Sequence, residues 1–242
     1  MSIKEIDRRE MVAHSYKFPW SIQGLLQITY ETPTGPQAFY GSGTMVSPHY
    51  FMTAGHNLRL TDRTAVKLGI KKTSRPINIK FSLCSHENKT KYPSTIIGYA
   101  FHDEWGEKES QYYDYALVKL ADPVGEKAGH ASLKVLEEEA FFEAKVNVTG
   151  YPGDKVREYP QMYTMEGPIK AVTEHQIFYD VDTSPGQSGS GVWRREDKDI
   201  QVVGVHGYGG DIYNSGVRIT YEVVEQVKEW IKRMPPEEDA RA

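Results

Sequence analysis

One glycine-rich stretch of the chain holds a serine that could act as a nucleophile. Residues 182–191 read Asp-Thr-Ser-Pro-Gly-Gln-Ser-Gly-Ser-Gly, with Ser188 in the middle. Glycine allows a tight turn and leaves room for a substrate, so Gly186 and the residues after it could point backbone N–H groups toward a carbonyl oxygen that gains negative charge. The same pattern also suits an ordinary surface turn between two strands. Residues elsewhere in the chain are needed to distinguish an acyl-transfer nucleophile from an ordinary surface turn.

A histidine and an aspartate upstream fit the same chemistry. His56 ends the sequence Thr-Ala-Gly-His, and a general base for a serine must titrate near neutral pH. Asp114 stands at the mouth of an apolar stretch, where a partly buried carboxylate could orient the imidazole. Alone, His56 is an ordinary strand-end histidine and Asp114 a turn or cap residue. Together with Ser188 they have the chain order His, Asp, Ser, which belongs to the chymotrypsin-like double barrel.

Composition excludes several classes of protein. The chain has 242 residues and a formal net charge of −4, which suits one large β-domain or two small barrels and disfavours nucleic acid as a partner. We find no apolar run long enough to span a bilayer. Residues 1–10 are polar and charged, so we expect no signal peptide in this chain. Cys84 is the single cysteine, which rules out an internal disulfide, and its apolar surroundings predict a buried thiol in a strand.

The spacing of short apolar runs and turns predicts an all-β barrel or sandwich instead of βαβ units. We predict a polar surface loop over residues 102–113 and a connection between two halves over residues 121–143. Apolar residues at helical spacing after Thr220, which can cap a helix, predict one amphipathic helix packed on the second barrel over residues 221–234. The expected strands cover residues 22–30, 39–46, 50–54, 65–70, 77–83, 95–100, 115–120, 145–149, 162–172, 176–181, 191–194, 201–206 and 216–219.

Three motifs resemble the catalytic motifs of trypsin-fold serine peptidases, at residues 53–56, 114–119 and 186–190. Residues 146–155, Val-Asn-Val-Thr-Gly-Tyr-Pro-Gly-Asp-Lys, and the Gly-Val-His at 204–206 resemble the V8-like glutamyl endopeptidase branch. The sequence Asp7-Arg8-Arg9 resembles the start of the mature chain in that branch. The likeness runs from about residue 5 to about residue 233.

The resemblance implies a single trypsin-like peptidase domain over residues 1–242, built from two six-stranded antiparallel β-barrels with a C-terminal α-helix. The implied boundaries are an N-terminal barrel at about 19–122, a linker at about 123–143, a C-terminal barrel at about 144–220 and the helix at about 221–234. It also implies protein or peptide substrates, a monomer, and no cofactor, metal, nucleic acid or membrane partner. The family is usually secreted, whereas a native start at Met1 would make the chain intracellular.

The resemblance further implies a role for each motif residue. Ser188 is the expected nucleophile, His56 the general base and then acid, and Asp114 the residue that orients His56. The backbone N–H groups of Gly186 and Ser188 are the expected oxyanion hole. In the family, a hydroxyl residue five positions before the nucleophile and a pocket histidine recognise an acidic P1 residue, and these positions hold the residues Thr183 and His206 here.

Two alternatives concern specificity and activity. A pocket for a carboxylate needs hydrogen-bond donors, which Thr183 and His206 supply, but Asp182 next to Thr183 keeps a basic P1 preference open. A catalytically inactive, peptide-binding trypsin-fold domain is a further alternative. An esterase of the α/β-hydrolase class would need the opposite order, Ser, Asp, His.

The chain departs from the family pattern at three points. Gln187 stands where the animal enzymes have the aspartate that pairs with a new N-terminus on activation. Residues 206–210, His-Gly-Tyr-Gly-Gly, are one residue longer than the usual form, in a segment expected to pair with the substrate backbone. A pro-segment, usual in the family, is not visible.

The histidines do not indicate a metal site, because His86, His130 and His175 lack the spacing of metal ligands.

Overall fold

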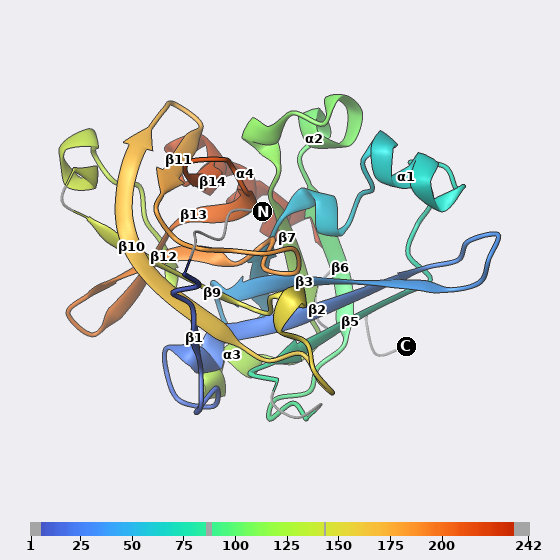
Figure 1. Cartoon of the computed structure of the whole chain (residues 1–242), viewed down its shortest axis with the longest axis horizontal. Helices are drawn as coiled ribbons and strands as arrows, with labels where there is room; N and C mark the ends of the chain where they lie inside the picture. The colour runs from blue at the N-terminus through green and yellow to red at the C-terminus, as the bar shows by residue number, and fades with distance from the viewer. Residues whose placement is uncertain (1–5, 86–88, 143, 235–242) are drawn as a thin grey trace.

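The computed structural model describes residues 6–85, 89–142 and 144–234, and most of it is two β-sheets (Figure 1). The strands of the first sheet are β2 (Gln23–Tyr30), β3 (Gln37–Met45), β4 (Tyr50–Thr53), β5 (Asn78–Leu83), β6 (Ile96–Phe101) and β7 (Ala116–Leu120). They lie in the order β5-β2-β3-β4-β7-β6, and each neighbouring pair is antiparallel. Within the described residues the edge strands β5 and β6 share no ladder, so this sheet is a curled half-barrel.

The second sheet closes on itself. Its main strands are β9 (Lys145–Gly150), β10 (Tyr163–Val172), β11 (Gln176–Tyr179), β12 (Gly191–Glu196), β13 (Asp199–Tyr208) and β14 (Asn214–Arg218). The order is β10-β11-β14-β13-β12-β9, and β9 pairs with β10 as well as with β12. Two short strands join it: β1 (Glu10–Met11) pairs with β10, and β8 (Ser132–Leu133) runs parallel to β13. The predicted double-barrel fold is confirmed, with one closed barrel and one curled half-barrel.

The helices include several that the sequence did not indicate. They are α1 (Asp62–Leu68), α2 (Asp103–Lys108), α3 (Val124–Ala128) and α4 (Tyr221–Arg233), with 3₁₀ turns η1 (Trp20–Ile22), η2 (Gly55–Asn57), η3 (Gln111–Tyr113), η4 (Glu138–Phe141) and η5 (Gly153–Lys155). The predicted strand at 65–70 is therefore wrong. Thr61 Oγ1 caps α1 by accepting from Thr64 N at 3.1 Å, and Gly69 ends it in the left-handed region. The expected loop at 102–113 holds α2 and η3.

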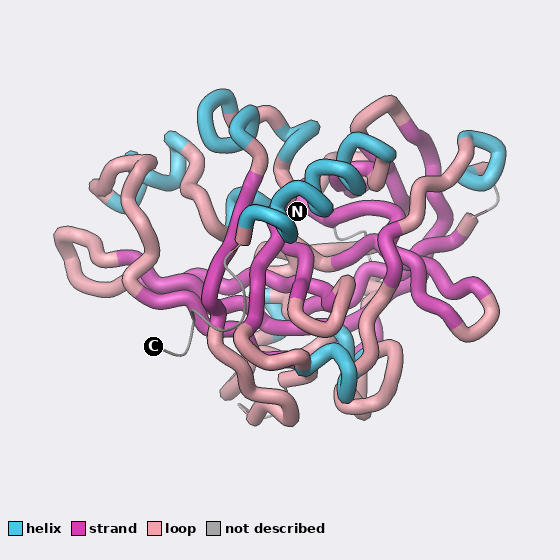
Figure 2. The backbone as a smooth tube through the Cα atoms, turned by 180° about the vertical axis from the view of Figure 1, so that it is seen from behind, coloured by secondary structure: helices cyan, strands magenta, loops and turns pink. Residues whose placement is uncertain are grey.

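The C-terminal helix α4 forms where the apolar spacing predicts it, and Thr220 Oγ1 caps it by accepting from Val223 N at 3.3 Å. The helix crosses the back of the molecule (Figure 2). Its buried face includes Trp230, whose ring lies 5.3 Å from that of Tyr115, just before β7 of the first sheet. The helix therefore also contacts the first half of the chain, a contact that the prediction did not include.

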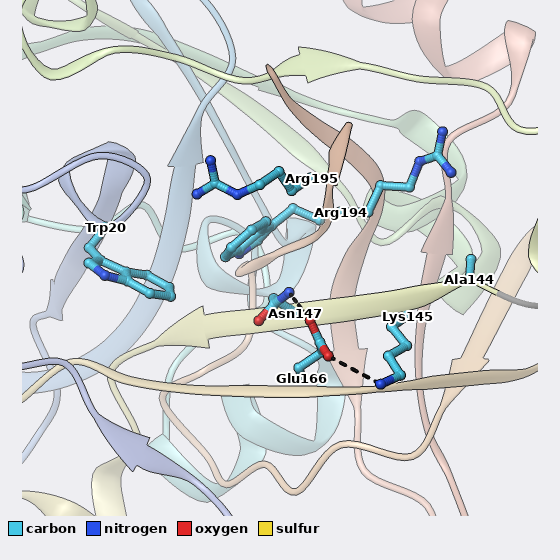
Figure 3. A pocket seen from close by; sticks show the side chains of 8 residues that line it. Trp20, Ala144, Lys145, Asn147, Glu166, Arg194 and Arg195 are labelled. Carbon is cyan, nitrogen blue, oxygen red and sulfur yellow. Dashed lines mark hydrogen bonds and ion pairs between the residues drawn. The ribbon is translucent and has the colours of Figure 1, made fainter. Parts of the chain in front are cut away.

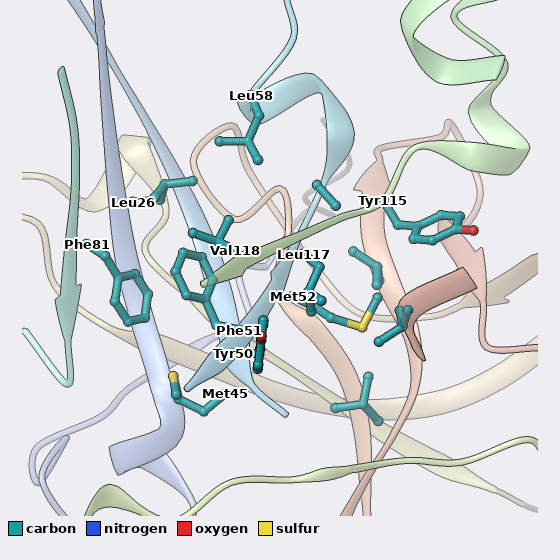
Figure 4. Close-up of a cluster of buried hydrophobic side chains, with 14 of the residues drawn as sticks. Leu26, Met45, Tyr50, Phe51, Met52, Leu58, Phe81, Tyr115, Leu117 and Val118 are labelled. Atoms are coloured by element: carbon teal, nitrogen blue, oxygen red, sulfur yellow. The ribbon is translucent and has the colours of Figure 1, made fainter. Parts of the chain in front are cut away.

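A cluster of buried side chains fills the first sheet and fixes the ends of its strands (Figure 4). Phe51 on β4 stacks on Phe81 of β5 with 3.9 Å between ring centroids. Val118 on β7 pairs with Phe51 across the strands and is fully buried. Burying each such side chain is worth about 1.5–3 kcal/mol, which holds β4 and β7 in one register. Two functional candidates lie at the ends of these strands.

Three further observations concern membrane helices, metal ligands and Cys84. In the described part of the chain no helix combines the length and apolar character needed to cross a membrane. The described residues also contain no cluster of three or more His, Cys, Asp or Glu that could hold a metal ion. Cys84 is buried as predicted, and burial raises the pKa of its thiol, but it sits in the turn after β5 instead of within the strand.

Candidate active site

Strand register brings His56 and Asp114 together. Thr53, the last residue of β4, pairs with Ala116, the first residue of β7. Because the strands are antiparallel, the segment that follows β4 and the segment that precedes β7 emerge at the same edge of the sheet. His56 lies in η2 after β4, and Asp114 follows η3 before β7. Two residues 58 positions apart in sequence thus become neighbours.

Asp114 holds His56 at two points. Its Oδ2 lies 2.6 Å from His56 Nδ1, and its Oδ1 accepts from the backbone N–H of His56 at 2.8 Å. The Asp114 side chain is fully buried, whereas 23% of the His56 side chain is exposed. Burial lowers the pKa of His56, but the negative charge of Asp114 and its hydrogen bond outweigh that effect and raise the pKa above its ordinary value. The ring is therefore fixed in orientation and made a stronger base.

Gly55 is required for this arrangement. A Cβ at position 55 would lie 2.7 Å from Trp105 Cδ1 and 3.1 Å from Asp114 Oδ1. Trp105, in α2, is buried and its ring lies 6.0 Å from that of His56. The glycine before the histidine thus lets an aromatic wall and a carboxylate approach the same peptide, which explains the Ala-Gly-His sequence in physical terms.

The loop that carries Ser188 is tied to both halves of the chain. The Ser188 carbonyl accepts from Ser42 N at 2.8 Å and from Asn57 Nδ2 at 2.9 Å. On the other side, Gly189 N donates to the His206 carbonyl at 2.8 Å, and His206 N donates to the Ser190 carbonyl at 2.9 Å. The loop is therefore held between β3 of the first sheet and β13 of the second.

Ser188 and His56 line one cavity together with Gly186. Among the hydrogen bonds between described residues, none joins Ser188 Oγ to His56, and such bonds often tighten only when a substrate is bound. Gly186 has a φ of 101°, a conformation that favours glycine. The backbone N–H groups of Gly186 and Ser188 donate to no other described residue. Two backbone donors of the loop that carries Ser188 thus have no acceptor among the described residues.

Thr183 and His206 are buried near this loop, with 1% and 3% of their surfaces exposed. Tyr179 on β11, itself fully buried, places its hydroxyl 2.6 Å from Nδ1 of His206. Burial, together with the positive charge of His56, lowers the pKa of His206 to about 3, while the backbone of Ser215 opposes the shift. Burial raises the pKa of Tyr179 well above its ordinary value. Both side chains are therefore neutral at pH 7.

Asp182 is engaged by Arg8. Arg8 Nε lies 3.0 Å from Asp182 Oδ2 and Arg8 Nη2 lies 2.9 Å from Asp182 Oδ1, while the backbone N–H of Arg8 donates to Oδ2 at 3.1 Å. Arg8 Nη2 also contacts Asp180 Oδ1 at 2.8 Å. Only 2% of the Asp182 side chain is exposed. The Asp182 carboxylate therefore forms a bidentate ion pair with Arg8, a geometry that the arginine side chain favours.

Arg9 forms a network that the sequence did not predict as part of the site. Its side chain is fully buried and contacts both carboxylate oxygens of Asp7 at 2.9 Å and Asp154 Oδ1 at 3.0 Å. Arg9 Nη1 also donates to Gln187 Oε1 at 3.2 Å, and Gln187 Oε1 accepts from Ser184 N at 3.1 Å. Ser184 Oγ in turn donates to Asp154. The side chain of Gln187, next to the nucleophile candidate, is thus anchored by an arginine.

A β-bulge lies in the segment 206–210. His206 pairs with Gly216 and Tyr208 pairs with Ser215, which leaves Gly207 as the added residue. The Tyr208 ring lies 6.2 Å from the His56 ring. Burial raises the pKa of Tyr208, as do the charge of Asp114 and a hydrogen bond to that carboxylate. The sequence gave no sign that Tyr208 would reach Asp114.

A cavity of about 540 Å³ lies elsewhere, on β9, β10 and β12 of the second sheet (Figure 3). Trp20 and Trp193 meet edge to face there, at 5.8 Å. Its charged side chains include Lys145, which pairs with Glu166 at 3.7 Å. None of the residues predicted for catalysis or P1 recognition lines this cavity.

Comparison with known proteins shows the family. A model of the trypsin-like peptidase domain matches residues 41–205. The chain belongs to this family. The matched segment runs from β3 to β13 and contains His56, Asp114 and Ser188.

The chain is also similar to several individual proteins. The chain is 28% identical to a glutamyl endopeptidase of Bacillus licheniformis over 78% of its length, and 28% identical to a glutamyl endopeptidase of Staphylococcus aureus over 85%. It spans 58% and 52% of the lengths of those two relatives. A Bacillus subtilis protein named extracellular metalloprotease is 27% identical over 95% of this chain and 69% of its own length. The predicted resemblance to the glutamyl endopeptidase branch is confirmed as a distant relationship.

The fold comparison agrees. A solved structure of a Glu endopeptidase in complex with MPD superposes with a TM-score of 0.76, covering 93% of this chain and 97% of that one, at 21% identity. A thermostable serine protease, AL20, superposes with a TM-score of 0.68 at 14% identity. These two likenesses establish a common fold.

Proposed function

We propose that this chain is a serine endopeptidase that cleaves peptide bonds through an acyl-enzyme, with His56, Asp114 and Ser188 as its catalytic triad. The observation that carries the proposal is the two-point contact of the buried Asp114 with His56, made at the edge of the cavity that Ser188 also lines. A structural histidine has no need of a buried carboxylate that fixes both its ring and its backbone beside a serine.

The geometry suits each step of acyl transfer. His56 takes the Ser188 proton as Oγ attacks the scissile carbonyl, and Asp114 holds the ring in the tautomer that leaves Nε2 free to accept. The backbone N–H groups of Gly186 and Ser188 stabilise the oxygen that becomes negative. His56 then gives its proton to the leaving amine. Water attacks the acyl-enzyme by the same route, with His56 again as base and then acid.

We further propose a preference for Glu at P1, with Asp second. His206 is neutral, and its Nδ1 lies 2.6 Å from the Tyr179 hydroxyl. We assign the donor role in this contact to the hydroxyl, which places the imidazole proton on Nε2, and a substrate carboxylate would compete with the backbone of Ser215 for the ring. Thr183 supplies a second donor from its hydroxyl. A P1 carboxylate that leaves water needs such partners, and its charge favours protonation of His206.

The same contacts weaken the two alternatives. A basic P1 residue would need the Asp182 carboxylate, which Arg8 already holds at two oxygens. An inactive peptide-binding domain would have no use for the raised pKa of His56 or for the unpaired N–H groups beside Ser188. The glutamyl endopeptidases of Bacillus licheniformis and Staphylococcus aureus, although distant, point the same way.

A covalent label tests the proposed nucleophile. A peptidyl diphenyl phosphonate with a Glu-like side chain should add to the protein and map to Ser188 by mass spectrometry of tryptic fragments. Ser188→Ala should abolish labelling, whereas Ser190→Ala, which removes a buried neighbouring hydroxyl, should retain it. Labelling that survives Ser188→Ala, or a wild-type protein that neither reacts nor hydrolyses peptides, would contradict the proposal.

A further inference from the structure

The cavity that Ser188 and His56 share is lined mostly by apolar and aromatic side chains. It has a volume of about 200 Å³. Its lining residues are Ile28, Tyr30, Phe39, Tyr40, His56, Asn57, Leu60, Thr64, Pro185, Gly186 and Ser188. Most are apolar or aromatic, and apart from His56 none is ionisable near neutral pH. Ile28, Tyr30 and Leu60 are buried, whereas 36% of Phe39 is exposed at the rim.

Strand pairing explains how these side chains meet. Phe39 on β3 stands opposite Ile28 on β2, and Tyr30 lies two residues further along the same face of β2. The Tyr30 and Phe39 rings meet edge to face at 6.3 Å. The paired strands β2 and β3 of the curled half-barrel thus supply one wall of the cavity.

Its place relative to the triad fixes which part of a substrate can reach it. Thr183 and His206, the proposed P1 residues, do not line it, and apart from Pro185 its apolar side chains come from the first half of the chain. His56 has to hand its proton to the departing amine, so the peptide on the leaving side of the cut must lie against the His56 ring. The cavity opens at that ring.

We propose that this cavity is the subsite for the residue that follows the cleaved bond, and that it selects a large apolar side chain such as Leu, Met or Phe. The inference rests on the proposed peptidase function. An apolar side chain loses its contact with water here and gains contacts with Ile28, Leu60 and Phe39. A charged side chain would give up water without finding a partner of opposite charge on the walls.

Acyl transfer to added amines measures the preference of this subsite directly. The acyl-enzyme is formed from the best ester substrate, and its acyl group is then transferred either to water or to an added amino-acid amide. The measured quantity is the fraction of acyl groups that the amide captures. The amine forms an amide bond to the acyl carbon, the bond from that carbon to Ser188 Oγ breaks, and His56 passes the proton of the amine to Oγ. Leucinamide and phenylalaninamide should capture the acyl group about tenfold more efficiently than glycinamide, as expected for one buried apolar side chain. Equal capture of leucinamide, glycinamide and aspartic acid α-amide would overturn the inference.

Substitutions at the rim locate the effect. Phe39→Ser should lower the ratio of leucinamide to glycinamide capture several-fold, while Phe142→Ser, which removes an 84% exposed aromatic outside the lining, should leave the ratio unchanged. Phe39→Arg should turn the preference toward aspartic acid α-amide, a gain that a merely loosened rim would not give. An unchanged ratio in both Phe39 variants would contradict the subsite. If no ester forms an acyl-enzyme, the proposed function itself fails; if one forms but shows no preference, only the subsite fails.

Discussion

Tyr179 Oη lies 2.6 Å from Nδ1 of His206, and both side chains are buried in the second barrel. The pair joins β11 to β13 beside the nucleophile loop, which His206 also holds through its backbone. A hydrogen bond to one imidazole nitrogen determines which nitrogen carries the proton. Tyr179 therefore influences which nitrogen of His206 carries the proton, which matters for the P1 role proposed for His206.

We predict that Tyr179→Phe lowers the ratio of kcat/KM for Glu over Gln at P1 by about tenfold, the cost expected for one unmade buried hydrogen bond. The loss should appear in the Glu/Gln ratio, because His206 is then free to change tautomer. Tyr221→Phe, at a 71% exposed position, is the matched control and should leave the ratio unchanged. A Tyr179→Phe enzyme with the wild-type ratio would show that Tyr179 has no part in P1 recognition.

The pH dependence should report the contact between His56 and Asp114. Since Asp114 raises the pKa of His56 and the base must be neutral, kcat/KM of the wild type should rise with pH through a pKa above the ordinary value of 6.5. Asp114→Asn removes both the charge and the correct tautomer, so kcat should fall by about 10⁴. The residual activity, followed on an ester substrate, should have its acidic limb at lower pH than the wild type. A near-normal rate, or a limb that does not move, would exclude Asp114 as the orienting residue.

Tyr208 should shift the same limb in the opposite direction. Tyr208→Phe removes a donor to Asp114, which leaves more negative charge to stabilise protonated His56 and raises the pKa of His56 further. We expect the acidic limb of kcat/KM to move to higher pH and kcat to fall by about tenfold, as for a hydrogen bond to a charged group. Tyr213→Phe, a 37% exposed tyrosine of the neighbouring loop, should change neither quantity. An unshifted limb in Tyr208→Phe would show that Tyr208 does not influence the contact between Asp114 and His56.

Arg9 should be a positioning residue for the nucleophile loop. Arg9→Met removes the charge-assisted hydrogen bonds to Asp7 and Asp154 and releases Gln187. Since both carboxylates are about a quarter exposed, we expect a loss of stability of about 1.5–3 kcal/mol. At a temperature where the variant is folded, its affinity for a peptide aldehyde should fall further below the wild-type value than its affinity for a cleavage product. The reason is that the bound aldehyde forms an oxyanion, which needs the N–H groups of Gly186 and Ser188. Arg194→Met, which breaks a surface pair with Glu196, is the control and should alter neither affinity. Equal losses for aldehyde and product would reduce Arg9 to a purely structural role.

Much of the site could be predicted from the sequence because its motifs are local. In the segments 53–56 and 114–119, the functional residue lies directly next to a strand in the sequence. Helix α4 could be predicted from Thr220 and the helical spacing of the apolar residues that follow it. The prediction of a strand at residues 65–70 was wrong because Ala65, Val66 and Leu68 are as apolar as the residues of a strand. Thr61, whose side chain caps the helix that forms instead, lies outside that run.

The remaining contacts depend on distances along the chain that no local pattern encodes. Arg9 reaches Gln187 across 178 positions and Asp154 across 145. The basic pair at positions 8 and 9 carried no sign of its partners, because any surface carboxylate could have met it. The extra residue at 207 was visible as a length difference, but the β-bulge and the direction of Tyr208 depend on the pairing of β13 with β14.

The P1 preference is the most direct test of the account as a whole. It is measured as kcat/KM for matched peptides that differ only in Glu, Asp, Gln, Ala or Lys at P1, on the wild type and on His206→Ala. The account predicts Glu first and Asp second in the wild type, with Glu favoured over Gln by at least about 100-fold, since a site built for a partner rejects analogues that lack it. His206→Ala should lose most of that margin, and Thr183→Val a smaller part. Lys as the best P1 residue, or equal rates for Glu and Gln in the wild type, would contradict it.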